Sequence, residues 1–283
     1  MKKLLLRYPV ISFFVLVLLW SSLIWKFVLP LFNIPSGTDW FWLGECAPGL
    51  AAIFLTWLTG NGVFQLIKPI TYWRVNPFYY YLVIILMAFF YLSAIGATAL
   101  QGKSIPSLAS LYSDVYFSFL GLKFYGPWMI PILTVLYFFC EEIGWRGYAL
   151  PKLMQRYDVF TASIIIGIAW SLFHIPLMNF SVLLAHPLFF VLYLFYTIIS
   201  SLFLSWLYLN TGGSLLLVSL SHAIDDTYGA FSPTIISSLG QGESGTVIFM
   251  RFLAFLPIFV LLFRQRHNVH NKLFAIKNRG AVL

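Results

Sequence analysis

The polar residues of this chain divide it into apolar stretches about 20 residues long. The clearest of them, Leu188 to Tyr208, contains no Asp, Glu, Lys, Arg or His. A helix rises about 1.5 Å per residue, so such a stretch crosses about 30 Å of hydrocarbon. Of the 283 residues, 60% are hydrophobic and only 9% are charged, whereas in soluble domains about a quarter are charged. The sequence therefore predicts an all-α fold, a polytopic membrane helical bundle, and excludes an ordinary soluble domain.

Eight stretches of this kind are separated by polar or proline-containing links. They are Pro9–Leu29, Trp40–Leu58, Phe78–Leu100, Trp128–Leu150, Val159–Met178, Leu188–Tyr208, Leu215–Phe231 and Val247–Phe263. We expect part of the longest link, Gln101–Pro127, to form an amphipathic helix on the surface. No fixed-period repeat or low-complexity tract divides the chain. Residues 1–283 are thus predicted to be a single integral membrane domain, with a basic, poorly ordered cytoplasmic tail at 264–283.

The net charge of +8 could indicate a nucleic-acid partner, but the distribution of the charge favours another explanation. Basic residues cluster between the apolar stretches and at both ends. With eight spans, both termini lie on one side of the membrane together with thirteen of the seventeen lysines and arginines. The four on the opposite side are Lys26, Lys103, Lys123 and Arg251. The positive-inside rule then predicts cytoplasmic termini, and no nucleic-acid partner is needed to explain the charge.

The two cysteines, Cys46 and Cys140, each lie within an apolar stretch, with no CxxC spacing and no second thiol nearby in the sequence. This isolation gives no sign of a metal site or of redox chemistry. We therefore expect both side chains to be packing residues.

An acidic and basic run interrupts the fourth apolar stretch. Glu141, Glu142 and Arg146 follow a segment, Trp128–Phe139, that contains no charge. A charge at such a depth costs several kcal/mol unless it is paired or solvated. Glu142 and Arg146 are four residues apart with the acid first, the favoured order for an ion pair on a helix. Glu141 is rotated by about 100° from Glu142 and must face another partner.

Two further apolar stretches carry histidines. His174 lies in the fifth, and the seventh contains His222 and Asp226, four residues apart on one helical face, with Asp225 turned off that face. A single histidine in a membrane helix is often an interhelical hydrogen-bonding group, and this alternative stays open for each histidine taken alone. The whole set buried in one bundle favours a functional cluster. The other histidines, which we expect to be solvated, are His186, His267 and His270.

Two chemistries fit the cluster. In one, Glu141 is the general base for a water that His174 also holds, while His222 and Asp226 stabilise the oxyanion formed when a peptide carbonyl is attacked. In the other, Glu141, His174 and His222 bind Zn²⁺, a hydrolytic ligand set with an open fourth position. The spacing does not separate them. No HExxH helix is present to require a metal.

In order along the chain, these residues resemble the motifs of the CPBP family, which contains the CAAX prenyl proteases of the Rce1 type and the bacterial bacteriocin-processing and Abi proteins. The three motifs are Glu141-Glu142-x-x-x-Arg146, a histidine on the next span (His174), and His222-x-x-x-Asp226. The core of the resemblance covers residues 125–231. Further similarities are Arg146-Gly147-Tyr148-Ala149-Leu150-Pro151-Lys152-Leu153, Gly213-Ser214, and Pro48-Gly49-Leu50-Ala51-Ala52.

Two positions depart from the family pattern. Trp170 stands four residues before His174, where the family commonly has Phe, so an aromatic wall is kept. Asp226 stands where the eukaryotic prenyl proteases usually have Asn. An anionic Asp226 would be a poor oxyanion donor, so this residue either carries a proton or orients His222.

The resemblance implies an intramembrane endopeptidase in the bacterial cell membrane, with a cavity open to the cytosol and the bilayer. Its substrate would be a peptide or a lipidated peptide, and its catalytic set would be Glu141, Glu142, Arg146, His174, His222 and Asp226. We favour a mechanism without a cofactor; zinc is the alternative. A non-catalytic immunity or scaffold protein is a second possibility, although it would not need a buried Glu141. A transporter is the third, but no half-helices are paired in matching halves of the chain.

Overall fold

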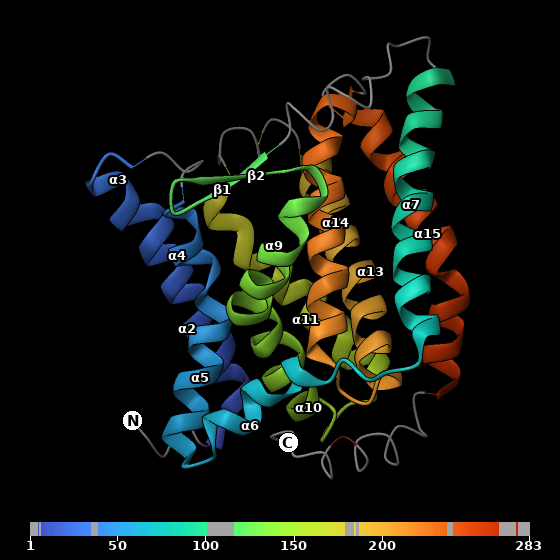
Figure 1. The fold of residues 1–283 in the computed structure, drawn as a ribbon. Coiled ribbons are helices and arrows are strands. Elements are labelled where there is room, and N and C mark those ends of the chain that lie inside the picture. Colours follow the sequence, from blue (N-terminus) through green and yellow to red (C-terminus); the bar gives the residue numbers. More distant parts are fainter. Residues whose placement is uncertain are drawn as a thin grey trace.

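The computed structural model describes residues 5, 7–34, 39–100, 116–178, 184, 187–236, 240–265 and 276. The fold is mostly helical (Figure 1). The first apolar stretch forms α2 (Pro9–Ser22), the π-helix η1 (Leu23–Val28) and α3 (Leu29–Leu31). The second forms α4 (Phe41–Glu45) and α5 (Ala47–Thr59), followed by α6 (Val63–Ile67) and the short 3₁₀-helix η2 (Lys68–Thr71).

The later stretches are also helical. They form α7 (Pro77–Leu100), α9 (Met129–Tyr137) with the π-helix η4 (Phe138–Ala149) and α10 (Leu150–Leu153), α11 (Val159–His174) with the 3₁₀-helix η5 (Ile175–Leu177), α13 (Pro187–Asn210), α14 (Leu215–Ile236) and α15 (Gly240–Gln265). Within the described part of the chain, three helical segments are long and apolar enough to cross a membrane: Pro9–Leu31, Val159–Leu177 and Phe190–Asn210. A total of eight spans stays a prediction.

The link between α7 and α9 differs from the prediction. It contains a hairpin of two antiparallel strands, β1 (Tyr116–Phe119) and β2 (Leu122–Tyr125). Leu120 and Gly121 form the turn, both with positive φ, as a tight hairpin requires. The all-α prediction is therefore wrong at this point, and so is the amphipathic helix for residues 116–125. Residues 101–115 lie outside the described part of the chain, as does most of the predicted tail.

The helices are arranged around η4, α11 and α14. Helices α2, α4 and α5 lie on one side of this centre, and α7, α13 and α15 lie on the other (Figure 1). Helix α5 packs tightly on η4 because each contributes a glycine that lies against the backbone of the other. A Cβ at Gly49 would meet the carbonyl of Phe139, and one at Gly144 would meet Pro48. This contact fixes the first half of the chain against the acidic run.

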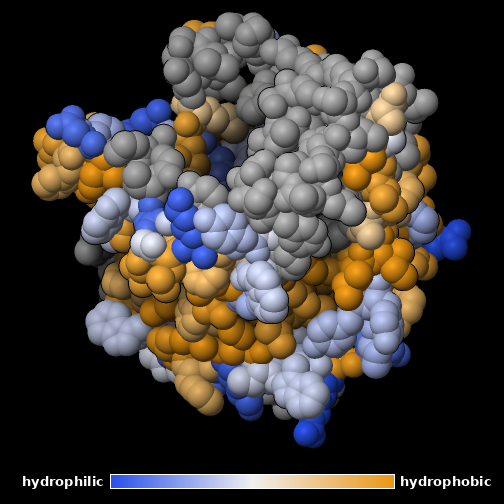
Figure 2. Space-filling model, turned by 45° about the horizontal axis from the view of Figure 1, so that its top comes forward, coloured by the Kyte–Doolittle hydropathy of each residue, from blue (hydrophilic) through white to orange (hydrophobic). Residues whose placement is uncertain are grey.

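The outer surface carries many large apolar side chains. Leu19, Ile85 and Leu92 are each more than 60% exposed. Figure 2 shows a broad hydrophobic band on the visible flank, with hydrophilic residues toward its ends. Large exposed apolar areas are rare on soluble monomers, so this surface is suited to lipid.

The two ends of the bundle differ in what covers them. At one, the hairpin lies near the start of α4, because the Gly121 amide donates to Asp39 Oδ2 at 3.1 Å. Phe119 and Phe124 of the hairpin pack against a small core around Tyr137. We call this the hairpin end. The opposite end, where α6 and α10 lie, is the α10 end (Figure 1).

Candidate active site

The acidic run lies on a wider helix than the sequence predicts. Residues Phe138–Ala149 form a π-helix, and all of them except Phe139 are buried. In such a helix the backbone hydrogen bonds join residues five apart, and π-helical turns occur frequently at functional sites. The predicted ordinary α-helix is therefore wrong here, although the four-residue spacing still brings the expected pair together.

Glu142 and Arg146 form the predicted ion pair. Arg146 Nη1 donates to both carboxylate oxygens of Glu142, at 3.0 and 3.1 Å, and both side chains are fully buried. The guanidinium also lies 5.1 Å from the centre of the Trp170 ring, a cation–π distance. Arg146 is thus enclosed between a carboxylate and an indole.

His222 joins this pair from α14. Its Nδ1 lies 2.8 Å from Glu142 Oε1, and its ring stacks on Tyr137 with the ring centres 4.1 Å apart. A carboxylate only accepts hydrogen bonds, so Nδ1 carries hydrogen. The other ring nitrogen, Nε2, lies 3.9 Å from Glu141 Oε1 and 3.8 Å from Asp226 Oδ2. The predicted grouping of His222 with Asp226 on one face is therefore present.

Glu141 points away from Arg146, as the helical rotation predicts. Its Oε2 accepts a hydrogen bond of 2.8 Å from Trp145 Nε1, and only 1% of the residue is exposed. Glu141 also lies near His222, His174 and Glu45. Glu45 is not among the residues that the sequence predicts for the site. One carboxyl oxygen each from Glu45 and Glu141 and one ring nitrogen of His174 lie within 4.8 Å of one another.

His174 is the last residue of α11. Its Nδ1 lies 3.0 Å from the backbone oxygen of Trp170, and its Nε2 lies 3.4 Å from Glu45 Oε1. The side chains of His174 and Asp226 are 16% and 35% exposed, whereas the other members of the cluster are nearly inaccessible. These two residues form the accessible edge of the site.

Asp225 lies outside the cluster. Its Oδ2 accepts a hydrogen bond of 3.0 Å from the hydroxyl of Tyr196 on α13. The helical rotation predicts this separation from His222 and Asp226. The remaining histidines, His186, His267 and His270, fall outside the described residues.

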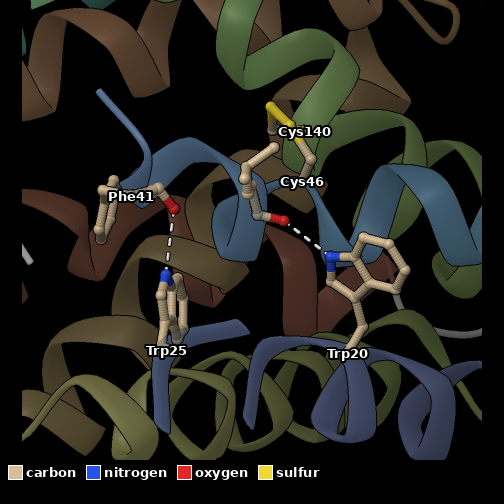
Figure 3. Close-up of a disulfide and its surroundings, with 6 residues drawn as sticks. Trp20, Trp25, Phe41, Cys46 and Cys140 are labelled. Atoms are coloured by element: carbon tan, nitrogen blue, oxygen red, sulfur yellow. Dashed lines mark hydrogen bonds between the residues drawn. A yellow bond between two sulfur atoms is a disulfide. The ribbon is translucent and has the colours of Figure 1, made fainter. Parts of the chain in front are cut away.

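The prediction that both cysteines are packing residues is wrong. Cys46 and Cys140 form a disulfide (Figure 3). Neither sequence neighbourhood contains a second thiol, so the pairing depends on the contact between α5 and η4. Cys46 directly follows Glu45, and Cys140 directly precedes Glu141. The disulfide therefore connects the two segments that carry these glutamates.

A metal site would differ from the predicted ligand set. Among the described residues, the group with metal-type ligand atoms close together is Glu45, Glu141 and His174. His222 is absent from that group, although its Nε2 lies 3.9 Å from Glu141 Oε1. Glu45 could have been found from the sequence only as an acid near the start of an apolar stretch, which by itself does not indicate where the side chain points.

Comparison with known proteins agrees with the motifs. Residues 123–228 match the family model "Type II CAAX prenyl endopeptidase Rce1-like". These residues form an Rce1-like domain. A stretch of 63 residues is also 46% identical to the CAAX prenyl protease 2 of Methanococcus maripaludis, and it covers 22% of this chain and 23% of that relative.

The Rce1-like domain contains η4, α11 and the first part of α14, and so all six predicted site residues from Glu141 to Asp226. The family resemblance inferred from the motifs is confirmed. Glu45 and Cys46 lie outside residues 123–228, which the family model matches.

Proposed function

We propose that this chain is an intramembrane endopeptidase that hydrolyses a peptide bond near the membrane surface. The observation that carries the proposal is the position of the buried Glu141 carboxyl group, which lies 3.9 Å from His222 Nε2 and within 4.8 Å of a His174 ring nitrogen, inside an Rce1-like domain. Buried ionisable groups inside a membrane bundle are costly and mark functional sites by default. A scaffold would gain nothing from keeping Glu141 there.

In this mechanism Glu141 is the general base. A water held by the Glu141 carboxylate, beside the His174 ring, gives its proton to that carboxylate, and its oxygen attacks the peptide carbonyl. The tetrahedral oxyanion then lies near His222, whose Nε2 donates to it when both ring nitrogens carry hydrogen. Glu141 returns the proton to the leaving amine, so that the protein ends in its starting state.

The remaining residues of the motifs hold these groups. Glu142 fixes His222 through Nδ1, and Arg146 neutralises Glu142. Asp226 lies 3.8 Å from His222 Nε2, a position from which it orients the ring or, when protonated, donates to the oxyanion. No step requires a metal.

The substrate is proposed to be a peptide or lipidated peptide. The similar protein from Methanococcus maripaludis is named a CAAX prenyl protease, and the apolar flank of the bundle is suited to a substrate that partitions into the bilayer. The motifs do not distinguish a prenylated peptide from another membrane peptide.

The test compares peptide fragments in membranes by mass spectrometry between cells with the unchanged chain and cells with Glu141→Gln. We expect the cells with the unchanged chain to contain peptide fragments that are absent from the cells with Glu141→Gln. Asp39→Asn is the control, because it removes a carboxylate outside the site. Identical fragments from the unchanged chain and Glu141→Gln would remove the protease proposal and favour an immunity or scaffold protein.

A further inference from the structure

Glu45 is a buried carboxyl group that the proposed mechanism does not use. It is the last residue of α4, is only 3% exposed, and contacts His174 through Oε1. Its Oε2 has no hydrogen-bond partner among the described residues. A buried carboxyl oxygen without a partner is costly in a low-dielectric interior, so the presence of Glu45 in this place points to a role.

The hydrogen bonds of His174 define what Glu45 can do. The Trp170 carbonyl accepts from Nδ1 at 3.0 Å, so Nδ1 carries hydrogen. Nε2 then faces Glu45 Oε1 at 3.4 Å. This contact is favourable only with a proton between the two atoms, either on a neutral carboxyl group or on a doubly protonated ring. In both cases one imidazole edge is held by Trp170 and the other by Glu45.

Three features hold Glu45 in this place. Trp25 Nε1 donates to the Phe41 carbonyl at 3.0 Å, and Trp20 Nε1 donates to the Leu43 carbonyl at 2.7 Å (Figure 3). These two bonds attach α4 to the first helical segment. A Cβ at Gly44 would overlap the Trp25 indole, so α4 lies directly against that ring.

The third feature is the disulfide between Cys46 and Cys140 (Figure 3). It joins the residue after Glu45 to the residue before Glu141. Hydrogen bonds, close packing and a covalent link thus act together on a five-residue helix. A catalytic constellation needs this kind of support, because a displacement of about 1 Å can cost 10²-fold in rate.

We propose that Glu45 is a positioning residue of the active site, which holds the His174 ring through Nε2 in the orientation required beside Glu141. The inference rests on the proposed function and adds to it a residue outside the Rce1-like domain. Because Glu45 contacts His174 and lies beside Glu141, its effect is on the chemical step rather than on substrate binding.

The same three side chains could instead hold a divalent cation, and the two arrangements respond differently to Glu45→Gln. A glutamine amide can donate to Nε2 or accept from it, so it keeps the contact with His174. It is a neutral and much poorer ligand for a divalent cation. The test therefore includes this variant and a measurement of bound metal.

The experiment uses the full chain in lipid, with Glu45→Gln, Glu45→Ala and the control Asp39→Asn, and with the peptide identified by the fragment comparison as substrate. We expect Glu45→Ala to lower kcat by about 10- to 100-fold with KM within about two-fold, and Glu45→Gln to restore most of the rate. The thermal unfolding temperature of Glu45→Ala should be unchanged or higher, because an unsatisfied buried oxygen is removed.

Four outcomes would overturn the inference. Full activity of Glu45→Ala beside an inactive Glu141→Gln would remove the role of Glu45 and leave the protease proposal intact, whereas full activity of both would remove the protease proposal as well. Loss of folding and rate together in Glu45→Ala would make Glu45 a structural residue. Stoichiometric metal, lost in an inactive Glu45→Gln, would replace the positioning role with a cation site.

Discussion

Glu142 and His222, eighty residues apart in the chain, form a buried hydrogen bond of 2.8 Å between Oε1 and Nδ1. The bond joins η4 to α14, and thus the first motif to the third. Arg146 Nη1 contacts the same carboxylate from the next turn of η4. Glu142 is therefore occupied on both sides, which leaves Glu141 as the glutamate available for chemistry.

The first prediction concerns Arg146. Arg146→Ala removes the arginine partner of the buried Glu142 charge and leaves only the hydrogen bond to His222, and we expect a loss of up to about 3 to 5 kcal/mol in the free energy of unfolding. Adding Glu142→Gln to this variant should recover part of the loss. The measurement is the amount and thermal stability of folded protein in detergent, with the exposed Arg156→Ala as control. No recovery in the double variant would contradict a stabilising role of the pair.

The second prediction is an asymmetry between the two glutamates. Glu141→Gln removes the proton acceptor with almost no change in volume, so we expect turnover to fall by about 10² to 10⁴ with unchanged unfolding. Glu142→Gln weakens contacts to Arg146 and His222 and should lower stability together with activity. Turnover and melting temperature measured on the same samples distinguish these effects. Equal stability losses in both variants would contradict the assignment.

The third prediction concerns metal. In the proposed mechanism the water is activated by side chains alone, so a chelator should leave turnover unchanged, and purified active protein should contain no stoichiometric zinc. The check is metal analysis together with activity before and after chelation. Activity that is lost with the chelator and restored by zinc would favour the metal mechanism instead.

Much of the site could be predicted because several of its residues are close neighbours in the sequence. Glu142 with Arg146 and His222 with Asp226 are pairs four residues apart, and helical geometry alone brings each pair together. The orientation of Glu141 away from Arg146 also follows from helical rotation. The position of Asp225 outside the cluster has the same cause.

Glu45 and the disulfide could not be predicted in this way, since both depend on how α4 and α5 pack against η4. That packing results from Gly49 and Gly144, which allow the two backbones to approach. Gly49 lies within the Pro48–Ala52 signature, but a short motif does not reveal its partner helix. The hairpin is not predicted either, because residues 116–125 belong to a link whose polar residues favour an amphipathic helix.

The fourth prediction concerns Asp158, which precedes α11 and caps it. Its Oδ1 accepts from the amides of Phe160 and Thr161, and its Oδ2 accepts from the Thr161 hydroxyl. Partial burial raises the pKa of Asp158, but these hydrogen bonds outweigh that effect and hold its pKa below the usual value. The cap therefore stabilises the fold above the pKa of the unfolded chain, and this contribution is lost as pH falls through the lower folded-state pKa.

We expect Asp158→Ala to cost about 0.5 to 2 kcal/mol at neutral pH, and the difference from the unchanged chain to shrink in acid. Asp158→Asn is the matched control, since asparagine caps the helix without titrating, and its stability should lack this acid-dependent term. Thermal unfolding over a pH series measures both. A difference for Asp158→Ala that is independent of pH would contradict the proposed cap.

The last prediction concerns the side of the membrane that the site faces. Helix α11 begins beside α10 and ends at His174, so His174 lies toward the hairpin end. Asp226 is one turn beyond His222 on α14, and the first residue of that helix, Leu215, lies close to Gly147 near the α10 end. The accessible edge of the site therefore faces the hairpin end.

The distribution of basic residues predicts that this end lies outside the cytoplasm. A disulfide between Cys46 and Cys140 fits the same assignment, because disulfides persist in oxidising compartments. The family resemblance implies instead a cavity open to the cytosol, so the two expectations conflict. We favour the assignment from charge and disulfide, which has a peptide substrate reach Glu141 from the outer face.

A membrane-impermeant thiol reagent applied to intact cells tests this assignment. Leu120→Cys in the exposed hairpin turn should react at once, whereas Gln155→Cys, exposed between α10 and α11, should react only after lysis. Cys46 and Cys140 give no background while they are paired. A reporter that is active only in the cytoplasm should be active when fused after Leu283, whereas a reporter that is active only when exported should be inactive there. The reverse labelling pattern would place both the termini and the α10 end outside, and would open the site to the cytosol as the resemblance implies.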